Sequence, residues 1–166
     1  MPSIETERLV KRYGSLAAVQ GIDLTVETGE IFGFLGPNGA GKSTTIKMLA
    51  TLVRPTSGRA ILNGYDVVRQ PDEVRRSIGM VFQDTTLDDQ LTALENLRFH
   101  ATLYGVPADV TKERIDDLAQ RVELTERLDD RVRTFSGGMK RRLEIIRGLL
   151  HRPAILFLDE PTLGLD

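Results

Sequence analysis

The sequence contains no cysteine, no long apolar run and no excess of positive charge. Without cysteine the chain can form no disulfide, use no thiol nucleophile and bind no zinc through thiolates, which suits a reducing compartment. The apolar run Ala154–Leu158 is far shorter than the about 20 residues that a membrane-spanning helix needs. The start of the chain, Met1–Glu5, lacks the basic and apolar regions of a secretion signal. We therefore expect no direct membrane insertion, so that any role at a membrane requires a partner chain.

The charge balance also argues against a nucleic-acid partner. Lys and Arg together number 22, Asp and Glu number 24, and the net charge is −2. A protein held on nucleic-acid phosphates is normally basic. The 166 residues, 40% of them hydrophobic, are enough for a folded domain with a core.

Strand patterns dominate the first half of the chain. Residues 4–26 alternate polar and apolar side chains around a turn at residues 13–15, which predicts two strands, the second over Ala18–Val26. The run Ile31–Leu35 is short, apolar and bounded by glycines, the pattern of a strand covered on both faces. A glycine-rich turn and a helix over Ser43–Val53 follow. Further strands are expected at Arg59–Leu62, Ile78–Phe82 and Ala154–Asp159, with a hairpin turn at Asn63-Gly64.

Helical patterns occupy the region between the later strands. A capping box at Thr92 and Glu95 opens the first helix, and apolar stripes at helical spacing indicate two more, the last capped by Ser136. We expect residues 1–90 and 150–166 to form a core and 91–149 a helical subdomain. Acidic residues dominate 109–130 and basic residues dominate 131–152, where Glu144 is the one acid. This asymmetry indicates either two solvated helix faces or a surface for a partner.

A phosphate-binding motif follows the apolar run at residues 31–35. It matches G-x-x-x-x-G-K-[ST] and consists of Gly36, Pro37, Asn38, Gly39, Ala40, Gly41, Lys42 and Ser43. Glycines let backbone N–H groups turn toward an anion, and the helix that follows adds the positive end of its dipole. The Lys42 ammonium suits the β- and γ-phosphates, the Ser43 hydroxyl can ligate Mg²⁺, and Thr44 can donate to a phosphate. The alternative is a plain glycine loop with a surface lysine.

Polar residues at two strand ends complete the candidate site. Asp159 and Glu160 directly follow the strand at residues 154–158. Asp159 is placed to hold Mg²⁺, and Glu160 to orient or deprotonate an attacking water. Gln83 follows another strand and can bind Mg²⁺ or water, although a glutamine at a strand exit is more often only solvated. Two acids at a strand end are weak evidence of a functional site when taken alone. The glycine loop in the same chain strengthens that interpretation.

Together these motifs resemble the nucleotide-binding domain of an ATP-binding cassette (ABC) protein. The sequence from Phe135 to Lys140 resembles the signature of that family, at the family's spacing from Lys42 and Asp159. Residues 163–166 resemble its D-loop, Gln83 its Q-loop, and Tyr13 the aromatic residue that stacks on adenine. The resemblance implies an α/β fold: a RecA-like P-loop NTPase core with an N-terminal antiparallel β subdomain and an inserted α-helical subdomain.

The resemblance also implies a mechanism. Two such domains meet head to tail, and ATP with Mg²⁺ lies between the glycine loop of one and, in trans, Ser136, Gly137 and Gly138 of the other. A serine and two glycines at a helix N-terminus fit a second anion site. Glu160 and Gln83 would be catalytic, and Ser43, Gln83 and Asp159 would bind the metal.

The function implied is that of the ATP-binding subunit of an exporter. It would be cytoplasmic, peripheral on the inner face of the membrane, and coupled through its helical part and residues 83–90 to a separate membrane-spanning permease. One alternative is a soluble ABC ATPase that remodels DNA or ribosomes, although the stretch between Gln83 and Ser136 is too short for the coiled coil that such proteins usually insert. Another is a module that binds ATP without turning it over.

Two departures from the family pattern affect these expectations. Met139 stands where the family usually has Gln, and Phe135 where it has Leu. Met139 and the stretch Phe82–Pro107 resemble daunorubicin-resistance ATP-binding subunits of type-2 exporters. The chain also ends at Asp166, before the family's switch histidine and last strands, which indicates a C-terminal truncation. Neither His100 nor His151 takes the place of that histidine.

Overall fold

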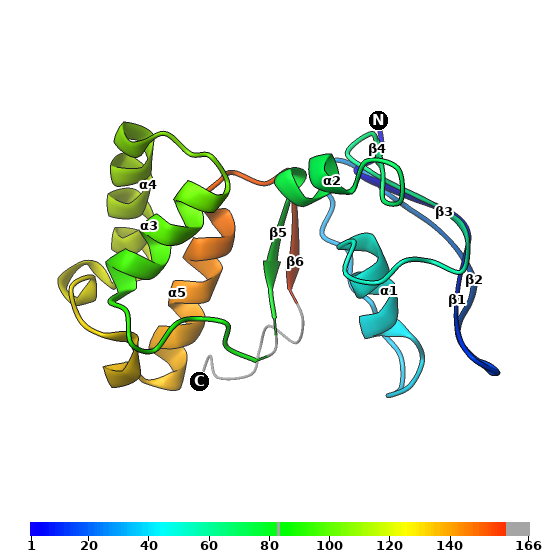
Figure 1. The fold of residues 1–166 in the computed structure, drawn as a ribbon, viewed down its shortest axis with the longest axis horizontal. Helices are drawn as coiled ribbons and strands as arrows, with labels where there is room; N and C mark the ends of the chain where they lie inside the picture. The colour runs from blue at the N-terminus through cyan, green and yellow to red at the C-terminus, as the bar shows by residue number, and fades with distance from the viewer. Residues whose placement is uncertain (83, 159–166) are drawn as a thin grey trace. The chain divides into compact units, whose positions relative to one another are not determined.

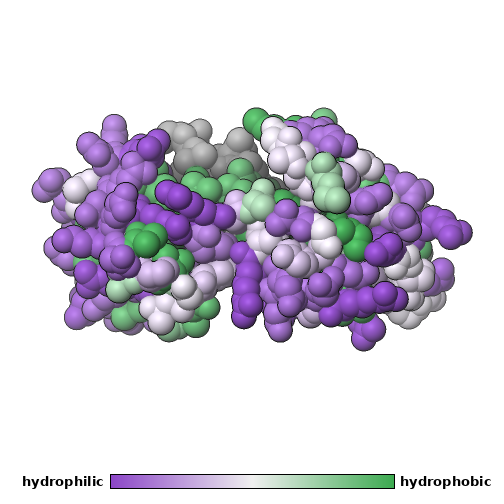
Figure 2. Space-filling view, turned by 90° about the horizontal axis from the view of Figure 1, so that it is seen from above, coloured by the Kyte–Doolittle hydropathy of each residue, from purple (hydrophilic) through white to green (hydrophobic). Residues whose placement is uncertain are grey.

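The computed structural model of the chain describes residues 1–82 and 84–158 and divides into two compact units (Figure 1). The N-terminal unit covers Met1–Ile78, and the second, here called the helical unit, begins at Gly79. Hydrophilic residues predominate on the face of the molecule that Figure 2 shows, with smaller hydrophobic areas among them.

An antiparallel sheet forms most of the N-terminal unit. Its order is β2-β1-β3-β4, with β1 at Ile4–Tyr13, β2 at Leu16–Val26, β3 at Ser57–Leu62 and β4 at Tyr65–Asp66. The expected hairpin of the first two strands is confirmed, with Tyr13 paired to Leu16 at its tip. The Asn63-Gly64 turn is confirmed as well. Both residues have positive φ, 48° and 84°, as a two-residue hairpin turn between twisted strands requires.

Two helices complete the N-terminal unit. Helix α1 (Lys42–Leu49) contacts β2 and buries Ile46, Met48 and Leu49. It ends four residues earlier than the helix expected over residues 43–53. Helix α2 (Pro71–Ser77) was not expected from the sequence. Its signals are a proline at the first helical position, acids in the first turn and arginines in the last, which suit the helix dipole.

The strand predicted at Ile31–Leu35 is wrong. In the structure residues 31–35 form no strand, and Ile31 and Leu35 are 100% and 96% exposed. Apolar composition favours a buried strand only where a neighbouring strand supplies ladder hydrogen bonds. None of the strands that the structure describes pairs with this run.

The described residues of the helical unit form three helices and most of a two-stranded sheet. The helices are α3 (Ala93–Leu103), α4 (Ala108–Arg121) and α5 (Gly137–Leu149), and 3₁₀ turns at Thr125–Arg127 and Val132–Thr134 join the last two. The sheet pairs β5 (Ile78–Val81) with β6 (Ile155–Leu158). Helix α5 lies close against β5, because a Cβ added at Gly79 would come within 2.4 Å of the Gly148 carbonyl oxygen.

Local sequence signals set the helix starts in this unit. The capping box is confirmed: Thr92 Oγ1 accepts from the Glu95 amide at 3.1 Å, and Glu95 Oε2 accepts from the Thr92 amide at 2.7 Å. Ser136 caps α5 by accepting from the Met139 amide at 3.3 Å. The apolar stripes then meet in one cluster, whose fully buried members include Leu97, Ile115, Leu124, Leu143, Ile146 and Leu150.

Two leucines of α3 offer a matched test of this core. Leu97 is fully buried, whereas Leu103 is 66% exposed. Leu97→Ala should lower the free energy of unfolding by about 2–5 kcal/mol, because it removes packed methyl groups and leaves a cavity. Leu103→Ala should cost less than about 1 kcal/mol. Denaturant unfolding measures both, and equal losses would contradict this packing of α3.

Candidate functional site

The glycine loop has a backbone that favours glycine at three positions. Gly36, Gly39 and Gly41 have φ angles of 154°, 85° and 87°, in the region that L side chains rarely adopt. Gly41 is restricted a second time, because a Cβ there would lie 2.4 Å from the carbonyl oxygen of Ala18 on β2. The sheet therefore holds the end of the loop directly.

Among the described residues, no side chain caps the backbone N–H groups at the start of helix α1. Its N-cap is Gly41, which has no side chain to accept from the first turn. The N–H groups of Lys42, Ser43 and Thr44 belong to that turn, and they and the helix dipole favour an anion. Buried Thr45 fixes the start of the helix from inside, with its amide and hydroxyl donating to the Gly41 carbonyl at 2.8 and 2.9 Å.

The Lys42 side chain folds back over the loop. Its ammonium donates to the carbonyl oxygens of Gly36 at 2.5 Å and Pro37 at 2.9 Å. A phosphate entering the loop would compete with these two carbonyls for the ammonium. A charge-assisted bond to phosphate is stronger than a bond to a neutral carbonyl, so the exchange favours the anion.

Tyr13 lies at the tip of the β1–β2 hairpin, in the same unit as the glycine loop. Its ring is about half exposed, and the Lys11 ammonium lies 5.0 Å from the ring centroid. That ammonium is anchored by a 2.7 Å hydrogen bond to the Arg54 carbonyl. The hairpin that carries Tyr13 also contacts the glycine loop, at the carbonyl of Ala18.

The signature residues lie at the exposed start of α5. Ser136 and Gly137 are exposed, and a Cβ at Gly137 would meet nothing within 4 Å. Phe135 turns inward, where it joins the core with the Arg127 guanidinium 5.7 Å from its ring centroid. The departure from leucine at position 135 therefore changes the core and leaves the exposed helix start intact.

The structure thus places Tyr13 and residues 36–44 in the N-terminal unit, and Ser136, Gly137 and Gly138 in the helical unit. The remaining predicted residues, Gln83, Asp159 and Glu160, lie outside the described residues, as does the D-loop-like segment at 163–166.

Two charged residues of α5 fit neither of the two interpretations given for the basic stretch at residues 131–152, a solvated helix face or a surface for a partner. Arg141 and Glu144 are only 6% and 3% exposed, so they lie neither on a solvated face nor on a partner surface. The sequence carried a weak signal of this arrangement, namely opposite charges three residues apart inside an apolar stripe.

A pocket of about 300 Å³ opens on the helical unit between α3 and the chain that follows β5. Buried Asn96 shapes one wall, where its side chain donates to the Asp88 carbonyl and accepts from the Asp88 amide, at 3.0 and 2.9 Å. Phe99 and Leu103 are exposed at the pocket. The lining consists of Thr86, Asp88, Leu91, Asn96, Phe99, His100, Leu103 and Arg147.

The fold and the loop define a nucleotide-binding P-loop protein, and comparison with known proteins gives the family. The family model described as "ABC transporter" matches residues 19–163, and the chain belongs to this family. A solved ATP-binding subunit of an ABC transporter superposes with a TM-score of 0.91 at 34% identity, covering 98% of this chain and 68% of that one. A dimeric ATP-binding cassette bound to ADP and phosphate gives 0.84 at 29% identity, covering 98% and 76%. The predicted fold class is thereby confirmed.

The curated relatives confirm the resemblance to resistance proteins. The chain is 48% identical to the daunorubicin/doxorubicin resistance ATP-binding protein DrrA of Streptomyces peucetius, covering 99% of this chain and 50% of that protein. It is 44% identical to the linearmycin resistance ATP-binding protein LnrL of Bacillus subtilis, over 98% and 52%. The chain therefore spans about half the length of these relatives. Among residues 1–82 and 84–158, no helix is both long and apolar enough to cross a bilayer.

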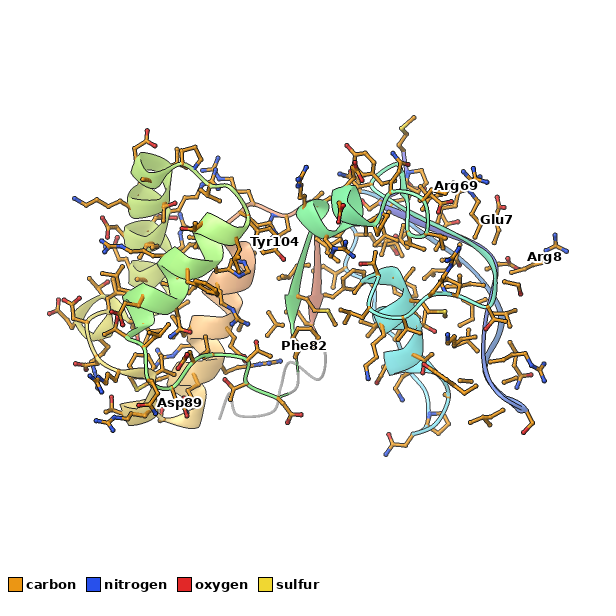
Figure 3. The ribbon with its side chains drawn as sticks, in the orientation of Figure 1. Glu7, Arg8, Arg69, Phe82, Asp89 and Tyr104 are labelled. Carbon is orange, nitrogen blue, oxygen red and sulfur yellow. The ribbon has the colours of Figure 1, made fainter. Side chains whose placement is uncertain are left out.

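His100 beside the pocket gives a test of the helical unit. Its ring stacks on Tyr104 with centroids 4.5 Å apart, Tyr104 stacks on His151 at 4.0 Å, and the two imidazole rings lie 5.5 Å apart (Tyr104 is labelled in Figure 3). Burial, which is the main cause, and the nearby charges of Arg147 and His151 together lower the pKa of His100 from 6.5 to about 4. The unfolded chain therefore binds the proton more readily than the folded one.

Stability contributed by neutral His100 should be fully present above pH 6.5 and be lost as the pH falls toward 4. An NMR titration of the His100 ring, assigned with a His151→Gln variant, should show a midpoint well below 6.5. A midpoint near 6.5 would show that the ring is solvated and would contradict this packing.

Proposed function

We propose that this chain is the ATP-binding part of an export system, which binds and hydrolyses ATP with Mg²⁺ and drives a separate membrane-spanning permease. The observation that carries the proposal is the glycine loop with three positive-φ glycines, a helix start free of side-chain caps and a lysine held over it. The names of the relatives, which are resistance ATP-binding proteins, support export as the process served.

Both ends of the ATP molecule, the adenine and the phosphates, would bind to the N-terminal unit. The Tyr13 ring offers an apolar face for adenine, and the amides of residues 39–44 with Lys42 bind the phosphates. Ser43 is exposed on the first turn of α1, and its hydroxyl has the oxygen chemistry that Mg²⁺ prefers. With Asp159 and Gln83 it would hold the metal, which neutralises phosphate charge when bound.

Turnover would need a second ATP-binding domain. In a head-to-tail pair, the exposed start of α5 with Ser136, Gly137 and Gly138 would meet the γ-phosphate held by the partner domain. Glu160 would then orient or deprotonate the attacking water, assisted by Gln83. In this scheme residues 1–90 and 150–166 act as the ATP-binding core and 91–149 as the helical subdomain.

The pocket of the helical unit suits a permease segment. Phe99 and Leu103 offer apolar contacts, while Asp88 and Arg147 offer polar ones. A short amphipathic helix on the cytoplasmic side of a membrane subunit has this combination of faces. The chain would thus act as a peripheral subunit at the inner face of the cell membrane.

Lys42→Ala tests the phosphate site. Loss of the ammonium should weaken ATP binding by about 3 kcal/mol or more, roughly 100-fold, because charge-assisted phosphate bonds are strong. Lys47→Ala, which removes an exposed lysine from the same helix, is the matched control and should leave affinity unchanged. Calorimetric titration of the full-length protein with Mg-ATP measures both. Equal affinities of the two variants would refute the role of the loop.

Glu160→Gln tests turnover separately from binding. The amide keeps the shape of the side chain but cannot take a proton, so hydrolysis should slow by about 10²-fold or more while ATP still binds. The variant should also accumulate an ATP-bound dimer, visible by size-exclusion chromatography with light scattering. Hydrolysis at the wild-type rate would remove Glu160 from the mechanism. A wild-type protein that binds ATP without hydrolysing it would favour the binding-only module.

A further inference from the structure

The two buried charges of α5 face the chain that follows β5. The guanidinium of Arg141 donates through Nη1 to the carbonyl of Phe82, the residue directly after β5 (labelled in Figure 3). Glu144 Oε1 accepts from the backbone amide of Thr86 at 2.7 Å. The two side chains also pair with each other, with Arg141 Nη1 and Glu144 Oε2 3.6 Å apart.

Arg147, one turn further along α5, secures the same segment. Its Nη1 donates to the Thr86 carbonyl at 3.0 Å, its Nη2 donates to the Thr86 hydroxyl, and it lies 4.0 Å from Glu144. Thr86 is therefore held at its amide by Glu144 and at its carbonyl by Arg147. Phe82 and Thr86 lie on the two sides of position 83, so α5 fixes the chain before and after that position.

These contacts connect two candidate functional regions of the helical unit. The N-terminal end of α5 carries Ser136 and Gly137, which are exposed for a phosphate. Its later turns hold Thr86, which lines the pocket together with Arg147. A helix is stiff along its axis, so a shift of its first turn moves Phe82 and Thr86 with it.

Stability alone does not account for a buried ion pair at this place. Removing two charges from water costs several kcal/mol, and well-packed apolar residues of similar size often stabilise a protein equally well or better. The benefit of Arg141 and Glu144 lies in their directed bonds to two backbone groups, which an apolar pair could not form.

We propose that Arg141 and Glu144 are positioning residues that lock Phe82 and Thr86 to α5, so that binding of phosphate at the start of α5 is transmitted to these two residues and to the pocket. The inference rests on the proposed ATPase function. It assigns a role to two residues that neither the phosphate loop nor the signature includes.

The decisive variant replaces the pair with apolar residues, Arg141→Met together with Glu144→Leu, in the full-length protein. If the pair is purely structural, this variant should fold and hydrolyse ATP at the wild-type rate. If the pair positions the segment, the variant should fold but hydrolyse ATP slowly. The control variant, Asp117→Leu with Arg121→Met, removes an exposed ion pair of 2.9 Å within α4.

The turnover rate separates the two roles, while thermal unfolding and hydrogen exchange check the fold and the loss of the contact. The apolar variant should unfold at or above the wild-type temperature, keep its KM for ATP within about twofold and lose about tenfold in kcat. The Thr86 amide, measured by hydrogen exchange without nucleotide, should exchange faster than in the wild type, because its acceptor is gone. The control variant should match the wild type in kcat and in exchange at residues 84–88.

Wild-type kcat in the folded apolar variant, or unchanged exchange at Thr86, would overturn the inference. If that variant does not fold, Glu144→Gln decides, since it keeps an oxygen for the Thr86 amide but loses the charge that faces both arginines. A several-fold lower kcat at unchanged KM then supports the inference, and wild-type kcat refutes it. A wild-type protein without ATPase activity would contradict the proposed function, while the exchange measurement would still test the positioning itself.

Discussion

The start of α1 is the constraint on which the candidate site depends. A helix must leave its first N–H groups without partners, and here Gly41 supplies no side chain to satisfy them. The positive φ of Gly41 and the Ala18 carbonyl 2.4 Å from its would-be Cβ keep any other residue out. The unsatisfied donors, the helix dipole and the Lys42 ammonium then coincide at one place. Such a place favours a phosphate chain over any neutral ligand.

The start of α5 in the helical unit differs from the start of α1, because a side chain caps it. Ser136 caps α5 with its own hydroxyl, which accepts from the Met139 amide, and the glycine that follows leaves the surface open. Further along the helix, Arg141 and Glu144 are buried. Arg141 donates to the carbonyl of Phe82, and Glu144 accepts from the amide of Thr86. One helix therefore carries the proposed anion site at its beginning and, in its middle, buried side chains that bond to the segment beside the pocket.

Local signals in the sequence were sufficient where the physics is local. The capping box at Thr92, the turn at Asn63-Gly64 and the apolar stripes of α3 to α5 depend on neighbouring residues, and all were predictable. Residues 31–35 were not, because a strand needs a partner whose position no local pattern encodes. The burial of Glu144 was missed for the same reason: its acceptor role depends on Thr86, which is 58 residues away in the chain. Composition indicated a charged surface, and tertiary packing decided otherwise.

The most direct test of the account is hydrogen exchange at the amides of residues 39–44 in the full-length protein, compared with no ligand, with adenosine and with Mg-ATP. If main-chain donors bind the phosphates, Mg-ATP slows exchange at Lys42, Ser43 and Thr44, and adenosine does not. Equal protection by adenosine, or no protection by Mg-ATP at concentrations that saturate the protein, would contradict the central claim.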